Sequence, residues 1–438
     1  MRQKGNKTMK KLLISILPLV VMLAFTGCSE SSSADSSKNK EEKINLRFAW
    51  WGEQPRHDYT LKVIKLFEEK NPDIHIEFEF SNWDDYWKRL APMAAANQLP
   101  DIMQMDLLYL KAYSANNLLE DLTPYIENKT INTKYIDEKI LLGGKVEDQI
   151  YGFPLGLNAP AVIMDPNLVA SATNQVPKQN WTWEDFEKIA MEVHKQKNIY
   201  GTNGMKPPEV FFPYFLRTNG KNLYNPEGTS LGYEDDQLFV DYFDRQLRLL
   251  DEGAFPRVDV TEQIKGIEDE LLVRQQAPMT WAYSNQYYSF SKESGQSLEI
   301  FVPPGPNQQT SLSVRASMLF SITKSSKHKE AAARFINFFV NDIEANKLIK
   351  GERGVPVSSK VAETVKKGLS TEQKKAFDYV FNVENTNNNV EIADPLGGIE
   401  VVHLLQDISE QILFKKITPR EGAQKFRKEA NEILKKNK

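Results

Sequence analysis

Hydrophobic and polar positions between residues 44 and 106 switch between the period of a strand and the period of a helix. In the helical segments apolar side chains fall three or four residues apart, as Leu61, Ile64 and Phe67 do. The strand around Ile76 alternates with charged residues, which places it near a sheet edge. This βαβαβ order predicts an α/β fold with a parallel sheet and right-handed crossovers. The predicted elements are strands at 44–49, 74–80 and 102–105 and helices at 59–70 and 83–97.

The pattern changes at Tyr151–Asn158, where Gly and Pro residues interrupt the periodicity. An extended stretch of this kind suits a crossing between two lobes, and we place a hinge there. Capping boxes that begin at Thr182 and Thr418 mark the starts of two helices. The other predicted elements in this half are helices at 236–250, 266–274 and 328–340 and strands at 277–282 and 317–323.

The first 28 residues have the layout of a secretory signal. Five Lys and Arg residues precede an acid-free apolar run from Leu12 to Phe25, which is too short for a membrane-spanning helix of about 20 residues. Cys28 is the one cysteine of the chain and stands where a bacterial lipobox would put it. We therefore expect a signal peptide at 1–27 and lipid on Cys28, with 28–43 as a flexible tether because it lacks large apolar side chains. This predicts a lipid-anchored protein on the extracytoplasmic face of the cell membrane.

Composition removes several classes of function. The 438 residues carry 55 Lys and Arg against 59 Asp and Glu, a formal charge of −4, which becomes −9 if residues 1–27 and their five positive charges are removed. An acidic chain offers no basic surface for nucleic acid. The five histidines are scattered and no nucleotide loop is complete, so we expect no metal and no cofactor. Gly228–Gly232 reads G-x-S-x-G, but polar turn residues surround it, so we predict a hairpin turn and no catalytic residue.

Aromatic and polar side chains follow the carboxyl ends of the three predicted parallel strands, where ligands of open α/β sheets bind. Aromatic rings flanked by carboxylates and amides suit a sugar, because its C–H faces pack on rings while its hydroxyls bond to planar polar groups. Trp50 and Trp51 are adjacent, so their side chains point to opposite sides and one of them is expected in the core. For Trp83, burial alone remains the alternative to stacking on a ligand. The candidate residues are Trp50, Trp51, Gln54, Arg56, Trp83, Asp84 and Asp106.

A second group of candidates follows the strand predicted at 277–282, where aromatic and amide side chains gather. For Trp281, burial is again the alternative to stacking. Three arginines present a planar fork that could bind a carboxylate, although most single arginines are solvated or paired at a surface. These further candidates are Trp281, Tyr283 and Asn285, together with Arg315 and Arg353, which join Arg56 as the three arginines.

Short motifs that are weak singly become specific in their order along the chain. With the lipobox, they resemble family 1 extracellular solute-binding proteins, the receptors of carbohydrate ABC importers, from about residue 44 to the C-terminus. More narrowly, 50–59, 82–106 and 350–357 resemble the receptors of rhamnogalacturonan oligosaccharide importers of Gram-positive bacteria. The motifs are Trp50-Trp51-Gly52, Asn71-Pro72-Asp73-Ile74, Leu99-Pro100-Asp101-Ile102, Tyr151-Gly152-Phe153-Pro154, Thr182-Trp183-Glu184-Asp185-Phe186 and Arg353-Gly354-Val355-Pro356-Val357.

The resemblance implies a two-lobe periplasmic-binding-protein-like fold with the ligand cleft between the lobes. Lobe 1 would take 44–154 plus about 280–340, and lobe 2 would take 155–279 plus about 341–438. The implied function is capture of an oligosaccharide, in the narrower resemblance an acidic pectin fragment, by hinge closure and its delivery to the permease subunits of an ABC importer. The protein would act as a monomer and break no bond.

Two rival classes remain at this point. A lipid-anchored lyase or glycosidase would need a pair of carboxylates at one centre, and Asp84 with Asp85 is the available pair. Adjacent residues rarely converge on one centre, and at a helix start they more often cap amide groups. An adhesin that binds other proteins would present an exposed apolar patch in place of a cleft.

Overall fold

The computed structural model describes residues 43–386 and 389–437. The predicted signal peptide, Cys28 and nearly all of the tether therefore lie outside the described residues. Within the described ranges, no helix combines the length and the apolar character that crossing a membrane would require.

The first sheet contains the predicted βαβαβ unit. Its strand order is β2-β1-β3-β12-β6, in which β1 runs parallel to β2 and β3, while β12 is antiparallel to β3 and β6. β2 is an edge strand, as its alternating polar face predicted. The helix predicted at 59–70 begins earlier because Pro55 occupies its first turn. The elements are β1 (Ile44–Trp51), α1 (Gln54–Lys70), β2 (Ile74–Ser81), α2 (Trp83–Ala95), β3 (Ile102–Met105), β6 (Phe153–Pro154) and β12 (Leu319–Ile322).

The second sheet is antiparallel, with the order β10-β8-β9. Both strands of the pair β8 and β9 are almost wholly buried, since helices cover this sheet. The expected start of the lobe 1 return at about residue 280 is wrong, because β9 pairs with β8 along its whole length. Elements of this half are β8 (Pro160–Met164), α6 (Pro166–Thr173), α7 (Trp183–Lys197), α8 (Pro208–Thr218), α9 (Gln237–Asp251), α10 (Val258–Thr261), β9 (Met279–Tyr283), α11 (Tyr287–Ser294) and β10 (Glu299–Phe301).

The prediction of a helix at 266–274 is also wrong. Only the short 3-10 helix η2 (Ile267–Asp269) forms there, and turns follow it. The adjacent side chains Leu271 and Leu272 are both buried, and Gln275 has a positive φ of 55°, so the chain bends where a helix would continue. By contrast, both predicted capping boxes are confirmed, at Thr182 before α7 and at Thr418 before the last helix. Gly228 to Gly232 lies in turns beside a bridge between Tyr224 and Leu231, as predicted.

Three short strands form a crossing sheet between the two larger ones, with the order β11-β7-β13. β7 (Gly156–Asn158) follows the predicted hinge, and β11 (Arg315–Ala316) is a second crossing between the two halves. β13 (Val355–Pro356) pairs with β7 but lies within a segment that stays beside the first sheet. β7 and β13 approach so closely that a Cβ on Gly156 would lie 2.3 Å from the Arg353 carbonyl oxygen. Gly354 adds a φ of +93°, a conformation that side chains with a Cβ rarely adopt.

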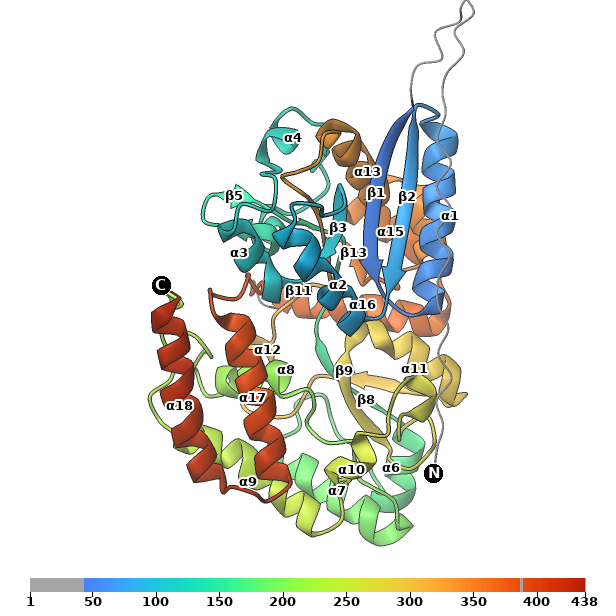
Figure 1. Cartoon of the computed structure of the whole chain (residues 1–438). Helices are drawn as coiled ribbons and strands as arrows, with labels where there is room; N and C mark the ends of the chain where they lie inside the picture. The colour runs from blue at the N-terminus through green and yellow to red at the C-terminus, as the bar shows by residue number, and fades with distance from the viewer. Residues whose placement is uncertain (1–42, 387–388, 438) are drawn as a thin grey trace, which may run out of the picture. The chain divides into compact units, whose positions relative to one another are not determined.

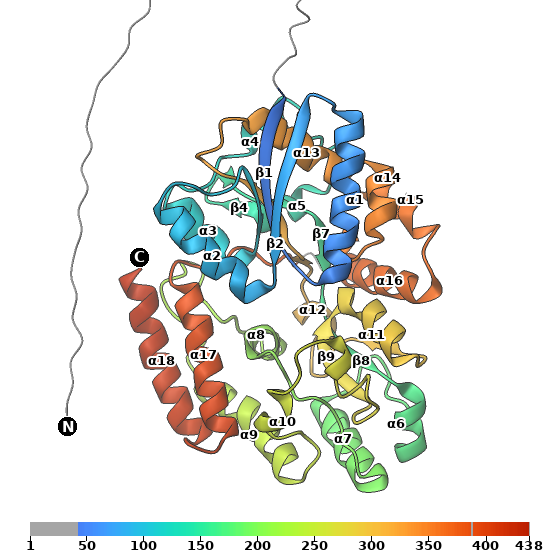
Figure 2. The ribbon, with the colours of Figure 1, turned by 45° about the vertical axis from the view of Figure 1, so that its right-hand side comes forward.

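The C-terminal helices divide between the two sheets. α13 and α14 contact α1, and α15 contacts α14, so 343–366 belongs beside the first sheet and not to lobe 2 as expected. α16 contacts α11 and β10, while α17 contacts α8, α9 and α18. Figure 1 shows the first sheet with α1 above β8 and β9, and Figure 2 shows α17 and α18 side by side. These helices are α13 (Lys329–Asn341), α14 (Ile343–Ile349), α15 (Ser359–Lys366), α16 (Thr371–Thr386), α17 (Gly398–Leu413) and α18 (Pro419–Lys436).

Smaller elements connect these parts. They are α3 (Leu107–Ala115), α4 (Thr123–Glu127), α5 (Glu138–Leu141), η1 (Leu142–Gly144), β4 (Lys145–Val146), β5 (Gln149–Ile150), η3 (Ser284–Gln286) and α12 (Gln308–Ser311).

Candidate functional site

Asp106 stands at the carboxyl end of β3 and joins the first sheet to the crossing sheet. Its Oδ1 accepts a hydrogen bond from the backbone N–H of Leu108 at 2.9 Å, which caps α3. Nη2 of Arg315, on β11, donates to Asp106 Oδ1 and Oδ2 at 2.9 and 2.8 Å. Two predicted site residues therefore form one ion pair, although 209 positions separate them in sequence.

The second sheet contributes Tyr283, which ends β9. Nη1 of Arg315 donates to the Tyr283 hydroxyl at 3.3 Å, and the guanidinium lies 5.7 Å from the ring centroid. Burial raises the pKa of Tyr283, so the phenol stays neutral at physiological pH. Asp106, Tyr283 and Arg315 thus bring together one residue from each of the three sheets.

Two carboxylates that sequence reasoning missed complete this group. Oε2 of Glu391 lies 3.8 Å from Arg315 Nη1, and the Ser313 hydroxyl donates to Glu391 Oε1 at 2.7 Å. Burial, together with the charges of Asp106 and Glu391, raises the pKa of Asp394 to about 7 against the opposing effect of Arg315. Both residues lie in an irregular segment before α17, where no periodicity marks them. We call Asp106, Tyr283, Arg315, Glu391 and Asp394 the Asp106–Arg315 cluster.

Two buried acceptor atoms beside the cluster have no hydrogen-bond partner among the described residues. Asn158 is the strand partner of Arg315 and is 4% exposed; its Nδ2 donates to Asn285 at 3.1 Å, but its Oδ1 is unpartnered. Glu209, on α8, accepts from Gln406 Nε2 at 3.0 Å through Oε1, while Oε2 is unpartnered. Burial raises the pKa of Glu209 against the opposing effects of its hydrogen bonds and of the charges of Arg315 and His403. Because buried unpartnered polar groups are costly, they point to a bound molecule that would supply donors.

An exposed indole lies at the same edge of the first sheet. The Trp83 side chain begins α2 and is 37% exposed, and its ring meets Trp51 edge to face at a centroid distance of 4.9 Å. Trp51 is 8% exposed and supports Trp83 from the interior. Tyr109, three residues after Asp106, lies 6.1 Å from the Trp83 ring, and burial raises its pKa to about 12 with contributions from Asp106 and Asp84. Trp83 is therefore available for stacking beside the cluster.

Comparison with known proteins decides the family of this chain. The family described as bacterial extracellular solute-binding protein matches residues 62–376. The chain belongs to that family.

Solved structures of similar proteins agree with this assignment. An extracellular solute-binding protein family 1 member from Alicyclobacillus acidocaldarius is 30% identical, with a TM-score of 0.68 over 90% of this chain and 99% of that one. A periplasmic oligogalacturonide-binding protein from Yersinia enterocolitica, in complex with saturated digalacturonic acid, is 20% identical, with a TM-score of 0.78 over 90% of this chain and all of that one. An ABC substrate-binding protein from Listeria monocytogenes in complex with cycloalternan is 19% identical, with a TM-score of 0.76 over 90% and 99%. The predicted periplasmic-binding-protein-like fold is confirmed.

Three tryptophans of the predicted set, Trp50, Trp51 and Trp281, lie in the interior of this solute-binding protein. The expectation that one of the adjacent pair Trp50 and Trp51 belongs to the core is confirmed, and the second is buried as well. Trp50 is 0% exposed, packs on Phe48 and Phe80, and donates from Nε1 to His57 Nδ1 at 3.0 Å. Trp281 is 3% exposed and stacks on Trp183 at a centroid distance of 6.0 Å. Trp50 on β1 and Trp281 on β9 belong to strands that are covered on both faces, so their rings are buried.

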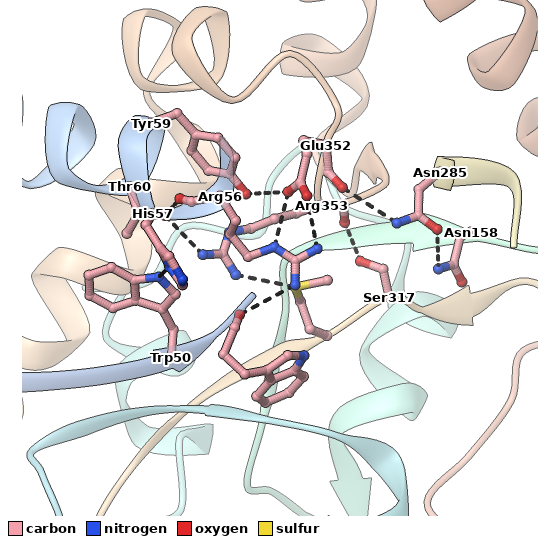
Figure 3. A network of polar contacts seen from close by, with 12 residues as sticks. Trp50, Arg56, His57, Tyr59, Thr60, Asn158, Asn285, Ser317, Glu352 and Arg353 are labelled. Carbon is pink, nitrogen blue, oxygen red and sulfur yellow. Dashed lines mark hydrogen bonds and ion pairs between the residues drawn. The ribbon is translucent and has the colours of Figure 1, made fainter. Parts of the chain in front are cut away.

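The prediction that Arg56 and Arg353 bind a ligand carboxylate is also corrected, because both side chains bind protein groups. Figure 3 shows the network that they form at the start of α1. Arg56 donates from Nε and Nη2 to the two carboxylate oxygens of Glu352 at 3.1 and 3.0 Å, and the Tyr59 hydroxyl donates to the same carboxylate at 2.5 Å. Arg353 is 2% exposed and donates to Gln104 Oε1 and, at 3.0 Å, to the Thr60 hydroxyl. Burial lowers the pKa of Arg353 to about 10, so it remains charged at neutral pH.

The other predicted residues lie at a groove next to this network. The groove encloses about 720 Å³ between the start of α1, the Glu352 turn, α11 and α16, and Gln54 and Asn285 line it. Asn285 also donates to the Glu352 carbonyl oxygen at 3.5 Å and accepts from Asn158, so it links the groove to the cluster (Figure 3). Asp84 is exposed in the first turn of α2. The predicted set therefore separates into cluster residues, groove residues, core residues and the exposed pair Trp83 and Asp84 at the start of α2.

Proposed function

We propose that this solute-binding protein captures an oligosaccharide at the Asp106–Arg315 cluster and Trp83 and delivers it unaltered to an ABC importer. The observation that carries the proposal is the pair of unpartnered acceptors, Asn158 Oδ1 and Glu209 Oε2, beside a cluster built from all three sheets. Sugar hydroxyls would supply the missing donors, and the C–H face of a ring would stack on Trp83. Structural neighbours that bind digalacturonic acid or cycloalternan support a sugar ligand.

Closure about the crossing sheet is the proposed means of capture. β7 and β11 each carry the chain between the two larger sheets, and β13 pairs with β7, so a small rotation there would move one sheet relative to the other. A sugar that contacts both Asp106 and Tyr283 stabilises the closed form by its differential affinity for that form. The polar groups of the cluster would then be satisfied only when the correct sugar is present, which gives specificity.

For the finer identity of the ligand, we propose a pectin-derived fragment of the rhamnogalacturonan type. The resemblance of 50–59, 82–106 and 350–357 supports it, as does the fold shared with an oligogalacturonide-binding protein. The three arginines predicted to meet a uronate carboxylate are all bonded to protein groups: Arg56 to Glu352, Arg353 to Thr60, and Arg315 to Asp106 at the cluster.

For location and partners, we propose a monomer that is lipid-anchored through Cys28 on the extracytoplasmic face and docks on permease subunits. Metabolic labelling with palmitate tests the anchor: the wild-type chain should take up label, and Cys28→Ser should not. Label in the Cys28→Ser protein, or none in either, would contradict lipidation.

A thermal-shift panel of plant cell-wall oligosaccharides tests the central proposal. Binding to the folded state alone at 100 times Kd would stabilise it by about 2.7 kcal/mol. The same mixtures, analysed for new reducing ends and unsaturated products, test the rival enzyme class. A stabilising sugar that stays intact supports a receptor. Turnover of that sugar, or a panel in which nothing stabilises the protein, would contradict the proposal.

A further inference from the structure

The Asp106–Arg315 cluster holds more negative than positive groups. Its carboxylates are Asp106, Glu391 and Asp394, with Glu209 nearby on α8, and its cation is Arg315. Arg217, on α8, has its Nη2 3.6 Å from Glu391 Oε1 and is the second arginine near these carboxylates. The acidic groups therefore outnumber the arginines at the place where the ligand is proposed to bind.

The guanidinium of Arg315 is already engaged by protein groups. Nη2 donates to both oxygens of Asp106, and Nη1 donates to Tyr283 and faces Glu391. A ligand carboxylate would have to displace one of these partners and leave a buried Asp or Glu without its cation. Loss of one member of a buried ion pair is strongly unfavourable.

Two buried acceptor atoms near the cluster lack a hydrogen-bond partner among the described residues, and Arg217 Nη2 is a buried donor that also lacks one. Asn158 Oδ1 can only accept a hydrogen bond, and an ionised Glu209 Oε2 likewise. Hydroxyl and ammonium groups donate, whereas an ionised carboxylate offers no hydrogen and would face carboxylates of the same charge. The raised pKa of Asp394, which responds to Asp106, Glu391, Arg315 and burial, agrees with a negative local field.

We infer that the sugar unit bound at the Asp106–Arg315 cluster is uncharged or cationic, and that the cluster rejects a uronate at this position. The inference rests on the proposed function and specifies its ligand. A pectin fragment that alternates neutral and acidic sugars agrees with the proposed ligand and with this inference, provided that its neutral unit contacts the cluster and its carboxylates lie outside it.

Calorimetric titration with matched oligosaccharides tests this inference. The probes are short galacturonate oligomers, the same oligomers with each carboxyl reduced to an alcohol, and glucosamine oligomers as the cationic arm. At pH 8 the wild-type protein should bind the reduced or the cationic oligomers at least about tenfold more tightly than the acidic ones.

Removing a cluster carboxylate should reduce the ratio of the affinity for reduced or cationic oligomers to the affinity for acidic oligomers. We expect Asp394→Asn and Glu209→Gln each to reduce the preference by about threefold or more, while Asp259→Asn, an exposed carboxylate on α10, leaves it unchanged. Two variants at different elements keep the test valid if one of them fails to fold.

The outcomes separate the two proposals. Tighter binding of the acidic oligomers by the wild-type protein, or an unchanged ratio in both cluster variants, overturns the charge inference and leaves the receptor proposal standing. Absence of binding in all three arms and in the cell-wall panel overturns the receptor proposal, and the charge inference with it.

Discussion

Two arginine networks of this protein differ in what surrounds them. At the cluster, one arginine meets several carboxylates beside unpartnered acceptors and an exposed indole. At the start of α1, Arg56 pairs with the carboxylate of Glu352, while Arg353 bonds to Gln104 and Thr60. The Arg353 guanidinium lies 5.6, 5.7 and 5.3 Å from the ring centroids of Tyr59, Phe320 and Phe339. The first network lies beside buried acceptor atoms that have no hydrogen-bond partner among the described residues, and the second is part of the packed interior. Unpartnered groups around an arginine, and not the arginine itself, are therefore what mark a candidate binding site.

The largest expected effect is on stability at the interior network. Arg353→Met removes a buried cation bonded to Gln104 and Thr60, and we expect a loss of about 3 to 5 kcal/mol of unfolding free energy. Urea denaturation measures it. An unchanged denaturation midpoint would mean that Arg353 is not structural, and retained stability with lost sugar binding would move it back among the ligand contacts.

The next effect depends on pH and belongs to the cluster. Since the pKa of Asp394 is about 7 in the folded protein and near its ordinary value when unfolded, the folded state holds a proton that the unfolded state has lost. Stability is then lost as pH rises from about 4 to 7, and the full penalty remains above that window. Asp394→Asn should remove this penalty, on the order of 4 kcal/mol at pH 8 and less than about 1 kcal/mol at pH 4.

Denaturation of Asp394→Asn and wild-type protein at these two pH values checks the sign. Stabilisation by the substitution that is equal at both pH values would assign it to packing and not to titration.

A smaller effect is expected at the rim, on binding and not on stability. Trp83→Ala should weaken binding of the sugar identified in the panel by about 2 kcal/mol, roughly 30-fold, because it removes a stacking surface. Phe414→Ala, at an exposed ring after α17, is the matched control and should leave affinity unchanged. Equal losses in the two variants would remove Trp83 from the site.

The smallest expected effect is the loss of unfolding free energy on removing an exposed arginine, which gives a reference value for the buried ones. Arg257 is an arginine whose side chain is 78% exposed and pairs with Asp259 at 2.9 Å. Arg257→Ala should change the unfolding free energy by less than about 1 kcal/mol. A loss comparable to that of Arg353→Met would show that burial does not distinguish the arginines of this chain.

Local patterns predicted the parallel strands, the edge position of β2 and both capping boxes, because a few neighbouring residues determine these features. The strands β11 and β13 of the crossing sheet contain two residues each, and only pairing with distant β7 defines them, so no period marks them. The helix predicted at 266–274 failed because its apolar residues are buried by a turn.

The candidate site was predictable where a side chain follows a strand end, as Asp106 and Tyr283 do. Whether an aromatic side chain at such a position faces inward depends on what covers the strand, which explains the wrong predictions for Trp50 and Trp281. Glu391 and Asp394 reach the cluster from an irregular segment near the C-terminus, and Glu209 from a helix start, so only the tertiary fold brings them together. Arg56 and Arg353 show that an arginine cannot be assigned before its partners are known.

The tight contact between Gly354 and β7 has a consequence for how this receptor can diverge. A methyl group at Gly354 would lie 2.6 Å from the Leu157 carbonyl oxygen, so this position beside β7 admits almost no larger side chain. Trp83 and Asp84 at the rim are exposed and can be exchanged without disturbing the interior. Under the proposed function, descendants of this chain could therefore acquire new sugars by changing Trp83 and Asp84 while they keep the same glycine contact in the crossing sheet.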